Sequence, residues 1–367
     1  MKKVRIYDNL EALPDSYLQL FDAEKTSSSF FASLPWFQNL FLNSLSKDHT
    51  IRLYGLEENG SARLLLPLCF IPRKNAWYLP RKLLAASNYY TSLFTLIQNG
   101  SIENCQENIN LLINAVINEK TRWDSIDLHP MAIDSEQFNA IQHACRSAGM
   151  AVQTYFCFGN WYLDVNGRSF HEYFDSLPSR LKNTLQRKYR SLAKRGDLEI
   201  KLIQTEDQLD AAIIAYEQVY HSSWKLPEAH PLFIAGLMRT CAQHGWLRLG
   251  VAYIADQPVA AQLWIVHKQI ASIYKLAYDD RYANLSVGSI LTSHMMQHVI
   301  DTDHVKEVDY LTGDDAYKQD WMSHRRGRWG LIAFNLHSMY GVLGAFWHIG
   351  RRLLKMKWFS IIKKITK

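Results

Sequence analysis

Residues able to bind a phosphate-bearing ligand and to move protons are concentrated between positions 278 and 321 of the 367-residue chain. A strand-like segment ends at Tyr278 and Asp279, and a loop with one glycine then leads into a helix with apolar periodicity. The first N–H groups of a helix are unpaired and lie at the positive end of its dipole. We therefore expect this loop to bind a phosphate through its backbone. Its residues are Leu285, Ser286, Val287, Gly288 and Ser289. The ordinary alternative is a helix start with Ser286 as N-cap.

A second polar cluster follows the next strand-like segment. It begins after Gly313 with Asp314 and Asp315 and continues with Tyr317 and Lys318. We expect Tyr317 to protonate a leaving group and Asp314 or Asp315 to act as a base or to bind an acceptor, because neighbouring carboxylates tend to raise the pKa of one member. Lys318 suits a phosphate or an acidic acceptor. The alternative is a surface turn of solvated charges.

Three further places carry candidate binding residues. Trp224 and Lys225 follow a helix with an apolar stripe, where Trp224 suits a sugar ring or an apolar arm; a buried aromatic anchor is the alternative for Trp224. Tyr278 and Asp279 are expected to line the cleft of the first ligand, with core packing as the alternative for Tyr278. Arg187 lies in a basic segment and is expected to meet phosphates.

The charge of the chain is unevenly distributed. The formal net charge is +6, and 48% of the residues are hydrophobic, which fits well-packed domains and, at this length, two of them. Residues 180–195 and 351–367 each contain seven basic residues and no acidic residue. Both segments indicate anionic partners, and a solvated helix face is the alternative for each. In residues 351–367 apolar side chains alternate with the basic ones, which predicts a basic amphipathic helix on an anionic membrane or a terminal helix with snorkelling lysines.

Several kinds of site are not indicated by the sequence. The five cysteines are scattered without a CxxC pair or a metal-ligand spacing, and neither HExxH nor GxSxG occurs. We therefore expect reduced cysteines and no metal. The N-terminal residues lack the apolar segment of a signal peptide, and no apolar run is long enough to span a bilayer. These patterns predict a cytoplasmic protein, with peripheral contact at the inner membrane face through the basic tail.

The expected elements follow an α+β order. In the second part of the chain, helices precede three strands of an antiparallel meander, and then come the glycine loop, a helix and a last strand. The predicted ranges there are helices over 169–195, broken near Pro178, and 206–224, strands over 246–254, 259–267 and 270–278, a helix over 289–301 and a strand over 306–311. A weaker version of this order occurs earlier, with strands over 50–56, 62–71 and 125–128 and helices over 107–118 and 138–149. We expect domains over 1–158 and 159–350 and a tail over 351–367.

An ordered set of motifs resembles a known family. The matching pieces are Pro35-Trp36, Arg187 with Arg190, Ser223-Trp224-Lys225, Gly245-Trp246-Leu247-Arg248-Leu249, Tyr278-Asp279, Leu285-Ser286-Val287-Gly288 with Leu291, and Gly313-Asp314-Asp315-Ala316-Tyr317-Lys318 with Trp321. The second part of the chain is similar to a GNAT acyltransferase domain. In particular it resembles the CelD-like and BioF-like group associated with bacterial cellulose and exopolysaccharide biosynthesis, and more distantly the Fem-type transferases.

This resemblance implies two tandem GNAT-like domains, each a mixed, mostly antiparallel sheet flanked by helices. It implies an acyl-CoA donor, most simply acetyl-CoA, and an amine or hydroxyl acceptor on a sugar, a glycolipid or an exopolysaccharide precursor. The second domain is then the catalytic one, and the first is degenerate, serving to bind the acceptor or to support the fold. One departure concerns the pyrophosphate loop, which in the family reads Arg/Gln-x-x-Gly-x-Gly/Ala, whereas here Arg281 stands seven residues before the single Gly288.

Two other functions remain open from the sequence. A Fem-type aminoacyl transferase that uses aminoacyl-tRNA would fit the tandem layout and the basic segment 180–195, although no long heptad run for a coiled-coil arm occurs. A non-catalytic GNAT-like module that binds a polysaccharide or a synthase is the other alternative.

Overall fold

The computed structural model describes residues 1–22, 29–72, 79–98, 105–120, 122–196, 198–348 and 350. Within these residues thirteen strands form one sheet in the order β1-β2-β3-β4-β6-β13-β7-β12-β11-β10-β9-β8, and the short β5 pairs with β3. The strands are β1 (Lys2–Tyr7), β2 (Thr50–Glu58), β3 (Ser61–Ile71), β4 (Lys82–Ala85), β5 (Ile97–Gln98), β6 (Ser125–Ala132), β7 (Ala151–Asp164), β8 (Leu198–Ile203), β9 (Leu247–Ile254), β10 (Gln257–His267), β11 (Ile270–Tyr278), β12 (Glu307–Asp309) and β13 (His324–Phe334).

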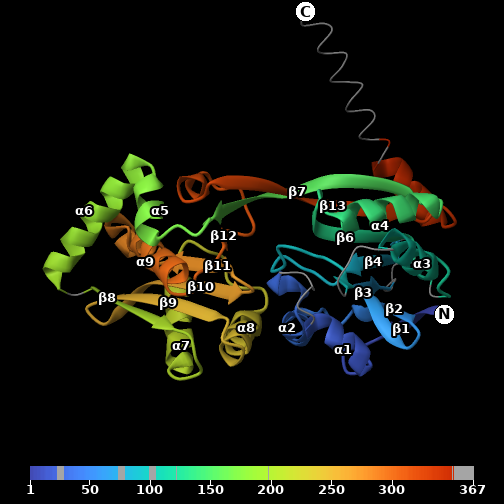
Figure 1. Cartoon of the computed structure of the whole chain (residues 1–367), viewed down its shortest axis with the longest axis horizontal. Helices are drawn as coiled ribbons and strands as arrows, with labels where there is room; N and C mark the ends of the chain where they lie inside the picture. The colour runs from blue at the N-terminus through green and yellow to red at the C-terminus, as the bar shows by residue number, and fades with distance from the viewer. Residues whose placement is uncertain are drawn as a thin grey trace, which may run out of the picture.

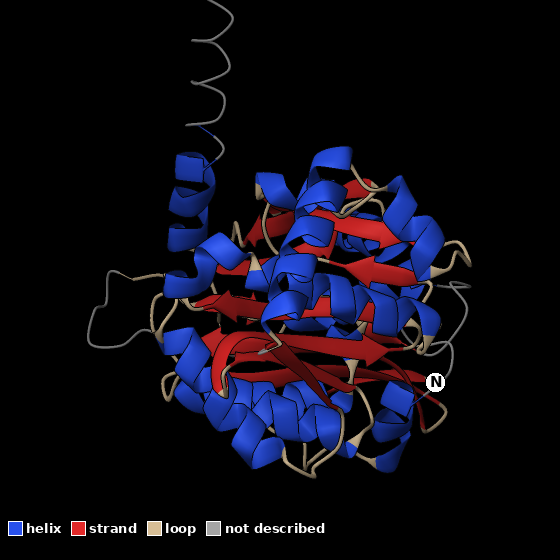
Figure 2. Ribbon diagram, turned by 90° about the vertical axis from the view of Figure 1, so that its left-hand side faces the viewer, coloured by secondary structure: helices blue, strands red, loops and turns tan. Residues whose placement is uncertain are grey.

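Helices flank this sheet on both sides (Figure 2). The α-helices are α1 (Asp15–Asp22), α2 (Leu34–Ser44), α3 (Cys105–Ile117), α4 (Glu136–Ser147), α5 (Phe170–Ser176), α6 (Ser179–Arg195), α7 (Leu209–His221), α8 (Pro231–Gln243) and α9 (Val287–Asp301). Three short 3-10 helices are η1 (Phe30–Ala32), η2 (Asp280–Leu285) and η3 (Ala316–Asp320). A further helical segment covers residues 339–348.

The sheet consists of two halves with the same strand arrangement. One half runs β1-β2-β3-β4-β6 and the other β8-β9-β10-β11-β12, and each continues into the pair formed by β7 and β13. In each half the last two strands are parallel, β4 with β6 and β11 with β12, and the chain forms α3 or α9 between them. The structure therefore shows the predicted tandem repeat of two mixed, mostly antiparallel units.

The strands β7 and β13 join the two halves (Figure 1). They pair antiparallel from His324 with Tyr162 to Phe334 with Ala151, while β13 pairs with β6 on its other edge and β7 with β12. Neither strand was predicted, because neither shows the strict alternation of buried and exposed residues that identifies a half-buried strand. The predicted limit between the domains, at residue 158, lies within β7. The domain limits 1–158 and 159–350 remain predictions.

The hydrophobic core also links the halves. On one face α1 and α2 pack with α7 and α8 in a single cluster, where the rings of Trp36 and Phe233 lie 5.6 Å apart. On the other face each half has its own cluster, around α3 and α4 in the first and around α5, α6 and α9 in the second. These contacts place loops of the first half beside the ends of β11 and β12.

The elements expected in the second half are present with small shifts. The meander forms as β9, β10 and β11, and the chain breaks between α5 and α6 at Leu177 and Pro178. The strand expected over 306–311 is shorter, and α7 begins at Leu209 because the preceding Gln208 has a left-handed backbone. The predicted tail over 351–367 lies outside the described residues.

Candidate active site at the opening between two parallel strands

The parallel strands β11 and β12 pair only at their first residues. The register joins Ile270 to Glu307 and ends at Ser272 with Asp309. Beyond that point β11 continues to Tyr278 while β12 ends, so the two segments separate. A cavity of about 440 Å³ lies in this opening, and we call it the helix-side cavity. Its lining is Arg180, Leu181, Thr184, Trp224, Gln262, Leu276, Ala277, Tyr278, Ala283, Ser286, Val287, Gly288, Ser289, Thr292, Tyr310, Tyr317, Asp320 and Trp321.

The first turn of α9 borders the helix-side cavity with uncapped N–H groups. Ser286 occupies the N-cap position, but its φ of 57° is left-handed and its side chain makes no capping hydrogen bond. The N–H groups of Val287, Gly288 and Ser289 have no partner one turn earlier in the helix. All four residues line the cavity. The alternative of an ordinary side-chain N-cap is therefore wrong, and the helix presents donors and a positive dipole end to the cavity.

A buried polar network fixes the start of α9 against the sheet. Gln262 on β10 donates to the Gly288 carbonyl at 2.9 Å and to the Thr292 hydroxyl at 2.8 Å. The Trp264 indole N–H in turn donates to the side-chain oxygen Oε1 of Gln262 at 2.9 Å. A Cβ on Gly288 would stand 3.1 Å from the Tyr278 ring, tighter than most side-chain contacts. Glycine suits this position because a larger residue would press on the Tyr278 ring where β11 and α9 approach closely.

Two residues expected at the first ligand do not line the helix-side cavity. Leu285 ends η2 and packs against the hydrophobic core of the second half. Asp279 is buried and forms an ion pair with Arg281 at 2.6 Å; hydrogen bonds from Arg281 hold the pKa of this carboxyl below its usual range. Asp279 thus shapes the turn after β11, whereas its neighbour Tyr278 does line the cavity.

A second cavity of about 350 Å³ adjoins the first. We call it the lysine cavity because Lys225, Lys275 and Lys318 all line it. Lys275 pairs with Glu228 at 2.6 Å and Lys318 with Asp315 at 3.4 Å. The full lining is Tyr89, Tyr90, Ser92, Trp224, Lys225, Ile273, Tyr274, Lys275, Leu276, Tyr310, Leu311, Thr312, Asp315, Tyr317 and Lys318.

Lys225 has no ion-pair partner among the described residues. Burial, together with the charges of Lys275 and Lys318, lowers the pKa of its ammonium group to about 8. The ammonium lies 5.8 Å from the centre of the Trp224 ring and 5.9 Å from that of Tyr220. A lysine with this pKa exists in both protonation states near neutral pH, as a general acid or base requires.

Aromatic side chains separate the two cavities. Trp224, Tyr310 and Tyr317 line both of them, as does Leu276. Tyr317 keeps 45% of its surface exposed, but burial of its phenol and the charge of Asp315 raise its pKa to about 12. Trp224 is 53% exposed and contacts Tyr278 with ring centroids 4.7 Å apart, so the alternative of a buried aromatic anchor is wrong.

The two candidate aspartates lie in different surroundings. Asp314 pairs with Arg325 at 2.5 Å above Gly159 and accepts a hydrogen bond from Trp161 at 2.9 Å. The hydrogen bond from Arg325 is the main reason why the pKa of Asp314 is lowered. The expectation of a raised pKa is therefore wrong for Asp314, because its neighbour is an arginine rather than an interacting carboxylate. Asp315, in contrast, lines the lysine cavity.

Lys318 is held in place by the turn that precedes it. It is buried, and its ammonium donates to the carbonyls of Thr312 at 2.6 Å and Gly313 at 3.3 Å. Gly313 adopts a φ of 106°, a backbone conformation that side chains strongly disfavour. Burial lowers the pKa of Lys318. The cluster after β12 is thus a packed wall of the lysine cavity, and the alternative of a loose turn of solvated charges does not describe Lys318.

The basic helix α6 borders the helix-side cavity at one end. Arg180 lines the cavity, whereas Arg187, the residue singled out from the sequence, lies two turns further along and outside the lining. Arg180, Arg187, Arg190 and Lys194 are all exposed and, at helical spacing, share one face. Sequence reasoning missed Arg180 as a lining residue, although a spacing of seven residues from Arg187 placed both on one helix face.

The first half of the chain also contributes to the lysine cavity. Tyr89, Tyr90 and Ser92 line it from the segment between β4 and β5. Tyr90 donates to Glu228 at 2.8 Å, and Lys275 lies 5.1 Å from the centre of the Tyr90 ring. Sequence reasoning missed these residues, because nothing in the local pattern reports a contact between positions about 140 apart. The one signal is a pair of adjacent tyrosines in an otherwise polar segment.

The described part of the chain contains no group of three or more His, Cys, Asp or Glu residues placed to hold a metal ion. It also contains no helix with the length and apolarity needed to cross a membrane. All five cysteines are free thiols.

A comparison with protein-family models matches the segment that supplies most of the lining of both cavities. The family model described as an acetyltransferase (GNAT) domain matches residues 179–319, from the start of α6 to η3. This range contains the start of α9 and Lys225, Tyr317 and Lys318, but not the first-half residues Tyr89 and Tyr90. No curated protein sequence matches the chain significantly.

Three solved structures share the fold over nearly the whole chain. FemX is 9% identical in sequence; the alignment covers 90% of this chain and 97% of the FemX chain, with a TM-score of 0.60. A conserved protein of unknown function from Bacteroides thetaiotaomicron is 9% identical, with 91% and 100% coverage and a TM-score of 0.55. The C-terminal domain of a protein described as a lysylphosphatidylglycerol synthetase from Agrobacterium fabrum is 12% identical, with 89% and 94% coverage and a TM-score of 0.51. At these identities the likeness establishes the fold alone.

Proposed function

We propose that this chain is an acyl-CoA-dependent N- or O-acyltransferase, with acetyl-CoA as the simplest donor. The observation that carries the proposal is the pair of adjoining cavities, one bordered by the uncapped start of α9 and the other by three lysines, which share Trp224, Tyr310 and Tyr317. Acyl transfer needs such a layout, because donor and acceptor must enter from different sides and meet at one point.

The helix-side cavity suits the donor. The N–H groups of Val287, Gly288 and Ser289 would bind the pyrophosphate of the co-substrate, and the exposed Arg180 adds a positive charge at the same cavity. The pantetheine arm would then lie along β11 beyond Ser272, where β12 no longer pairs with it. This arrangement brings the thioester to the aromatic boundary between the cavities.

Lys225 and Tyr317 would handle the protons. The acceptor nitrogen or oxygen attacks the thioester carbonyl, its proton passes to neutral Lys225, and the C–S bond breaks as the new bond forms. A thiol has a pKa of roughly 8.5, so protonated Lys225, with a pKa of about 8, is matched to return the proton to the leaving thiolate. The Tyr317 phenol, with a pKa of about 12, is a weaker acid than the thiol and is suited to donate a hydrogen bond to the thiolate.

The lysine cavity suits the acceptor. Two of its three lysines are paired with carboxylates, so Lys225 adds a net positive charge whenever it is protonated, and that charge favours the entry of an acceptor with an acidic group. The exposed rings of Trp224 and Tyr89 offer apolar faces for a sugar. We therefore propose a sugar, glycolipid or exopolysaccharide precursor as the acceptor class. The assignment to cellulose or exopolysaccharide biosynthesis rests on the resemblance described above and is part of this proposal.

A turnover assay tests the reaction. Purified protein is incubated with acetyl-CoA and a panel of neutral and acidic amino sugars, and the release of free CoA thiol is measured. Thiol release that depends on an acceptor supports the proposal and ranks acceptor classes. Absence of release with every acceptor, together with absence of acyl-CoA binding, would leave the non-catalytic module as the better description.

Aminoacyl transfer from tRNA is the alternative that one observation favours. The exposed basic face of α6, formed by Arg180, Arg187, Arg190 and Lys194, is wide enough to meet several phosphates beside the helix-side cavity. In that case aminoacyl-tRNA would bind in a strongly salt-dependent way and acyl-CoA would not bind. Arg187→Gln and Arg190→Gln together would then weaken tRNA binding and reduce its salt dependence.

We also propose peripheral contact with the cytoplasmic face of a membrane. The helix over 339–348 packs on the protein with its small residues: Ala345 is buried, and Cβ atoms on Gly341 and Gly344 would collide with Asn335 and Phe334. Its large apolar side chains point the other way and are exposed. These are Met339, Val342, Leu343, Phe346 and Trp347.

This orientation is the reverse of an ordinary surface helix, which buries its large apolar face. The following residues 351–367 carry seven basic side chains, no acidic one and several apolar ones. An apolar helix face next to a basic segment is the combination that binds anionic lipid surfaces. Such contact would bring the enzyme to a lipid-linked acceptor.

A further inference from the structure

A third cavity lies at the seam between the two halves. It is separate from the two cavities to which the acyl transfer is assigned above. It has a volume of about 270 Å³, and we call it the junction cavity. Its lining is Ser29, Phe30, Phe31, Ser92, Leu93, Ala132, His267, Ile270, Ser272, Glu307, Asp309, Leu311, Arg326 and Arg328. Both arginines lie on β13, two residues apart and so on one face of the strand.

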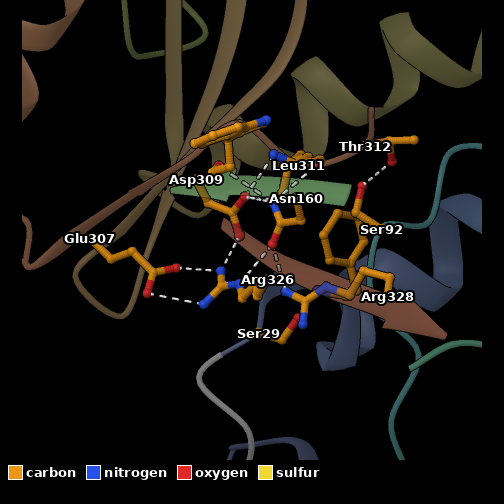
Figure 3. Close-up of polar contacts among 11 residues, drawn as sticks. Ser29, Ser92, Asn160, Glu307, Asp309, Leu311, Thr312, Arg326 and Arg328 are labelled. Atoms are coloured by element: carbon orange, nitrogen blue, oxygen red, sulfur yellow. Dashed lines mark hydrogen bonds and ion pairs between the residues drawn. The ribbon is translucent and has the colours of Figure 1, made fainter. Parts of the chain in front are cut away.

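Arg326 is fully compensated by its neighbours (Figure 3). Its guanidinium forms ion pairs with Glu307 and with Asp309, both at 2.6 Å, and donates to the Asn160 side chain at 2.7 Å. Asp309 also accepts from Asn160 at 2.5 Å and from the Leu311 N–H at 2.6 Å. The two carboxylates of the junction cavity are thus committed to Arg326.

Arg328 differs from Arg326 in having no carboxylate partner among the described residues. It is only 6% exposed, and its Nη2 donates a hydrogen bond to the side-chain oxygen of Asn160 at 3.0 Å. The buried Nε has no hydrogen-bond partner. Burial and the nearby charge of Arg326 lower the pKa of Arg328 to about 10, so the group still carries its charge at neutral pH.

A buried guanidinium that has no direct carboxylate partner and leaves a donor unpaired is costly, which favours a ligand at this position. A planar guanidinium can hold the two oxygens of a carboxylate or a phosphate through a fixed fork of N–H groups. A water molecule would satisfy one donor but would not supply the direct anionic partner that Arg328 lacks. The cavity has room for more than a single water.

We propose that the junction cavity is a binding site for an oxyanion group, a carboxylate or a phosphate, with Arg328 as its principal ligand. The hydroxyls of Ser92 and Ser272, from opposite halves of the molecule, lie on the same lining and can add hydrogen bonds. A bound anion would therefore join the two halves at their seam.

The junction cavity also adjoins the lysine cavity. Ser92 and Leu311 line both, and the Ser92 hydroxyl hydrogen-bonds to the Thr312 hydroxyl at 2.7 Å. The oxyanion therefore has two possible sources. It is either a free small anion or the far end of a longer ligand whose other end lies in the lysine cavity.

The first test is a titration of the full-length protein with inorganic phosphate, and separately with malonate, at constant ionic strength. Calorimetry and thermal unfolding are both recorded. The proposal predicts saturable binding with a dissociation constant of about 1 mM or below and a rise in Tm that saturates with it. No saturable binding of either anion would overturn the proposal without any variant being needed.

Variants assign the binding to Arg328. Arg328→Gln is expected to weaken phosphate binding at least about tenfold, and without anion it should be as stable as the wild type or more stable, since a buried unpaired charge is removed. Arg325→Gln, on the opposite face of β13, is expected to bind phosphate like the wild type. Equal binding by wild type and Arg328→Gln, or an equal loss in Arg325→Gln, would place the anion elsewhere and overturn the proposal.

A charge-conserving variant covers the case in which Arg328→Gln does not fold. Arg328→Lys keeps the charge but loses the fork, so it should fold and bind phosphate about tenfold more weakly than the wild type. Unchanged affinity in Arg328→Lys, when Arg328→Gln does not fold, would contradict a bidentate ligand role.

The source of the anion is tested with glucose 6-phosphate beside inorganic phosphate. If the ligand spans both cavities, Lys225→Met weakens binding of glucose 6-phosphate but not of inorganic phosphate. If the site serves a free anion, Lys225→Met leaves the binding of both probes unchanged. Either result supports an oxyanion site at Arg328 and identifies its source.

Discussion

Tyr310 and Tyr317 meet edge to face with ring centroids 5.8 Å apart, and both rings border the helix-side cavity and the lysine cavity. Tyr310 is buried, whereas Tyr317 is partly exposed, so one ring anchors the boundary and the other faces the ligands. The proposed transfer takes place at this boundary. Residues around it should therefore affect turnover more than binding of the donor.

Tyr317→Phe tests the hydrogen bond to the leaving group. Removing one donor from a developing charge costs roughly tenfold to a hundredfold in kcat, while the aromatic ring and the KM for acyl-CoA should be retained. Steady-state kinetics measures both parameters, and Tyr189→Phe on the exposed part of α6 serves as the control. An unchanged kcat in Tyr317→Phe would remove Tyr317 from the mechanism.

Lys225→Met tests the proton transfer. In the wild type, kcat/KM should rise with pH with a midpoint of about 8, because the neutral amine is the base. In the variant this rise of kcat/KM with pH should disappear, and kcat/KM should fall about a hundredfold or more. Lys201→Met, a lysine placed over Tyr253 away from both cavities, should leave the profile intact. The same rise with pH in both variants would assign the base elsewhere.

The same lysine predicts a stability difference with a definite sign. The folded pKa of about 8 lies below the ordinary value of 10.5, so the unfolded chain binds more protons between these pH values. Stability of the wild type should rise between pH 8 and 10.5, and Lys225→Met should be more stable by about 1–3 kcal/mol at pH 7. Denaturant titrations at several pH values measure this, and a destabilised variant at pH 7 would contradict the account.

Asp314→Asn separates a positioning role from a catalytic one. The lowered pKa makes Asp314 a poor base. Its ion pair with Arg325 and the hydrogen bond from Trp161 hold the turn after β12 against β13 and β7. Its contribution to stability is present above the usual pKa of 3.8 and is lost as the pH falls through the lowered value. The variant should show a slightly reduced Tm at pH 7, a difference that shrinks below pH 4, and the same pH–rate midpoint as the wild type. A shifted midpoint would restore Asp314 as a titrating catalytic group.

Phe346→Glu tests the membrane contact. A charge in the middle of the exposed apolar face should reduce binding to vesicles of anionic lipid at least about tenfold, because burial of that face and attraction to the lipid both weaken. Co-sedimentation measures the effect, and neutral vesicles should bind the wild type weakly. The Phe346 side chain is 78% exposed, so folding and turnover of soluble acceptors should be unaffected. Equal binding of both proteins would exclude this helix from the contact.

Much of the second half was predictable because its signals are local. The meander, the helix α9 and the break at Pro178 each follow from a periodicity or a breaker within a few residues. Gly288 was predicted to allow a close approach in a ligand-binding loop; the structure shows a close approach to Tyr278, and ligand binding at this loop stays a prediction. Ser286 was ambiguous, because the same residue type caps a helix in one backbone conformation and leaves it uncapped in another.

The missing parts depend on long-range contacts. β13 begins with His324, Arg325 and Arg326, a composition typical of an exposed segment, yet it lies between β6 and β7. Arg328 in the same run is buried, which no local pattern indicates. Tyr89 and Tyr90 reach the lysine cavity only through the packing of one half on the other. The pKa of Asp314 likewise depends on Arg325, a partner that β13 supplies.

The central claim is that the start of α9 binds an acyl-CoA donor. The most direct test is to titrate three proteins, wild type, Gly288→Arg and Ser289→Ala, with acetyl-CoA and with a longer acyl-CoA in a calorimeter. Gly288→Arg fills the space in front of Tyr278, whereas Ser289→Ala keeps the backbone N–H. The account predicts micromolar binding to the wild type and to Ser289→Ala, and loss of binding in Gly288→Arg. Equal binding by all three proteins, or no binding to a folded wild type, would contradict a donor site at the start of α9.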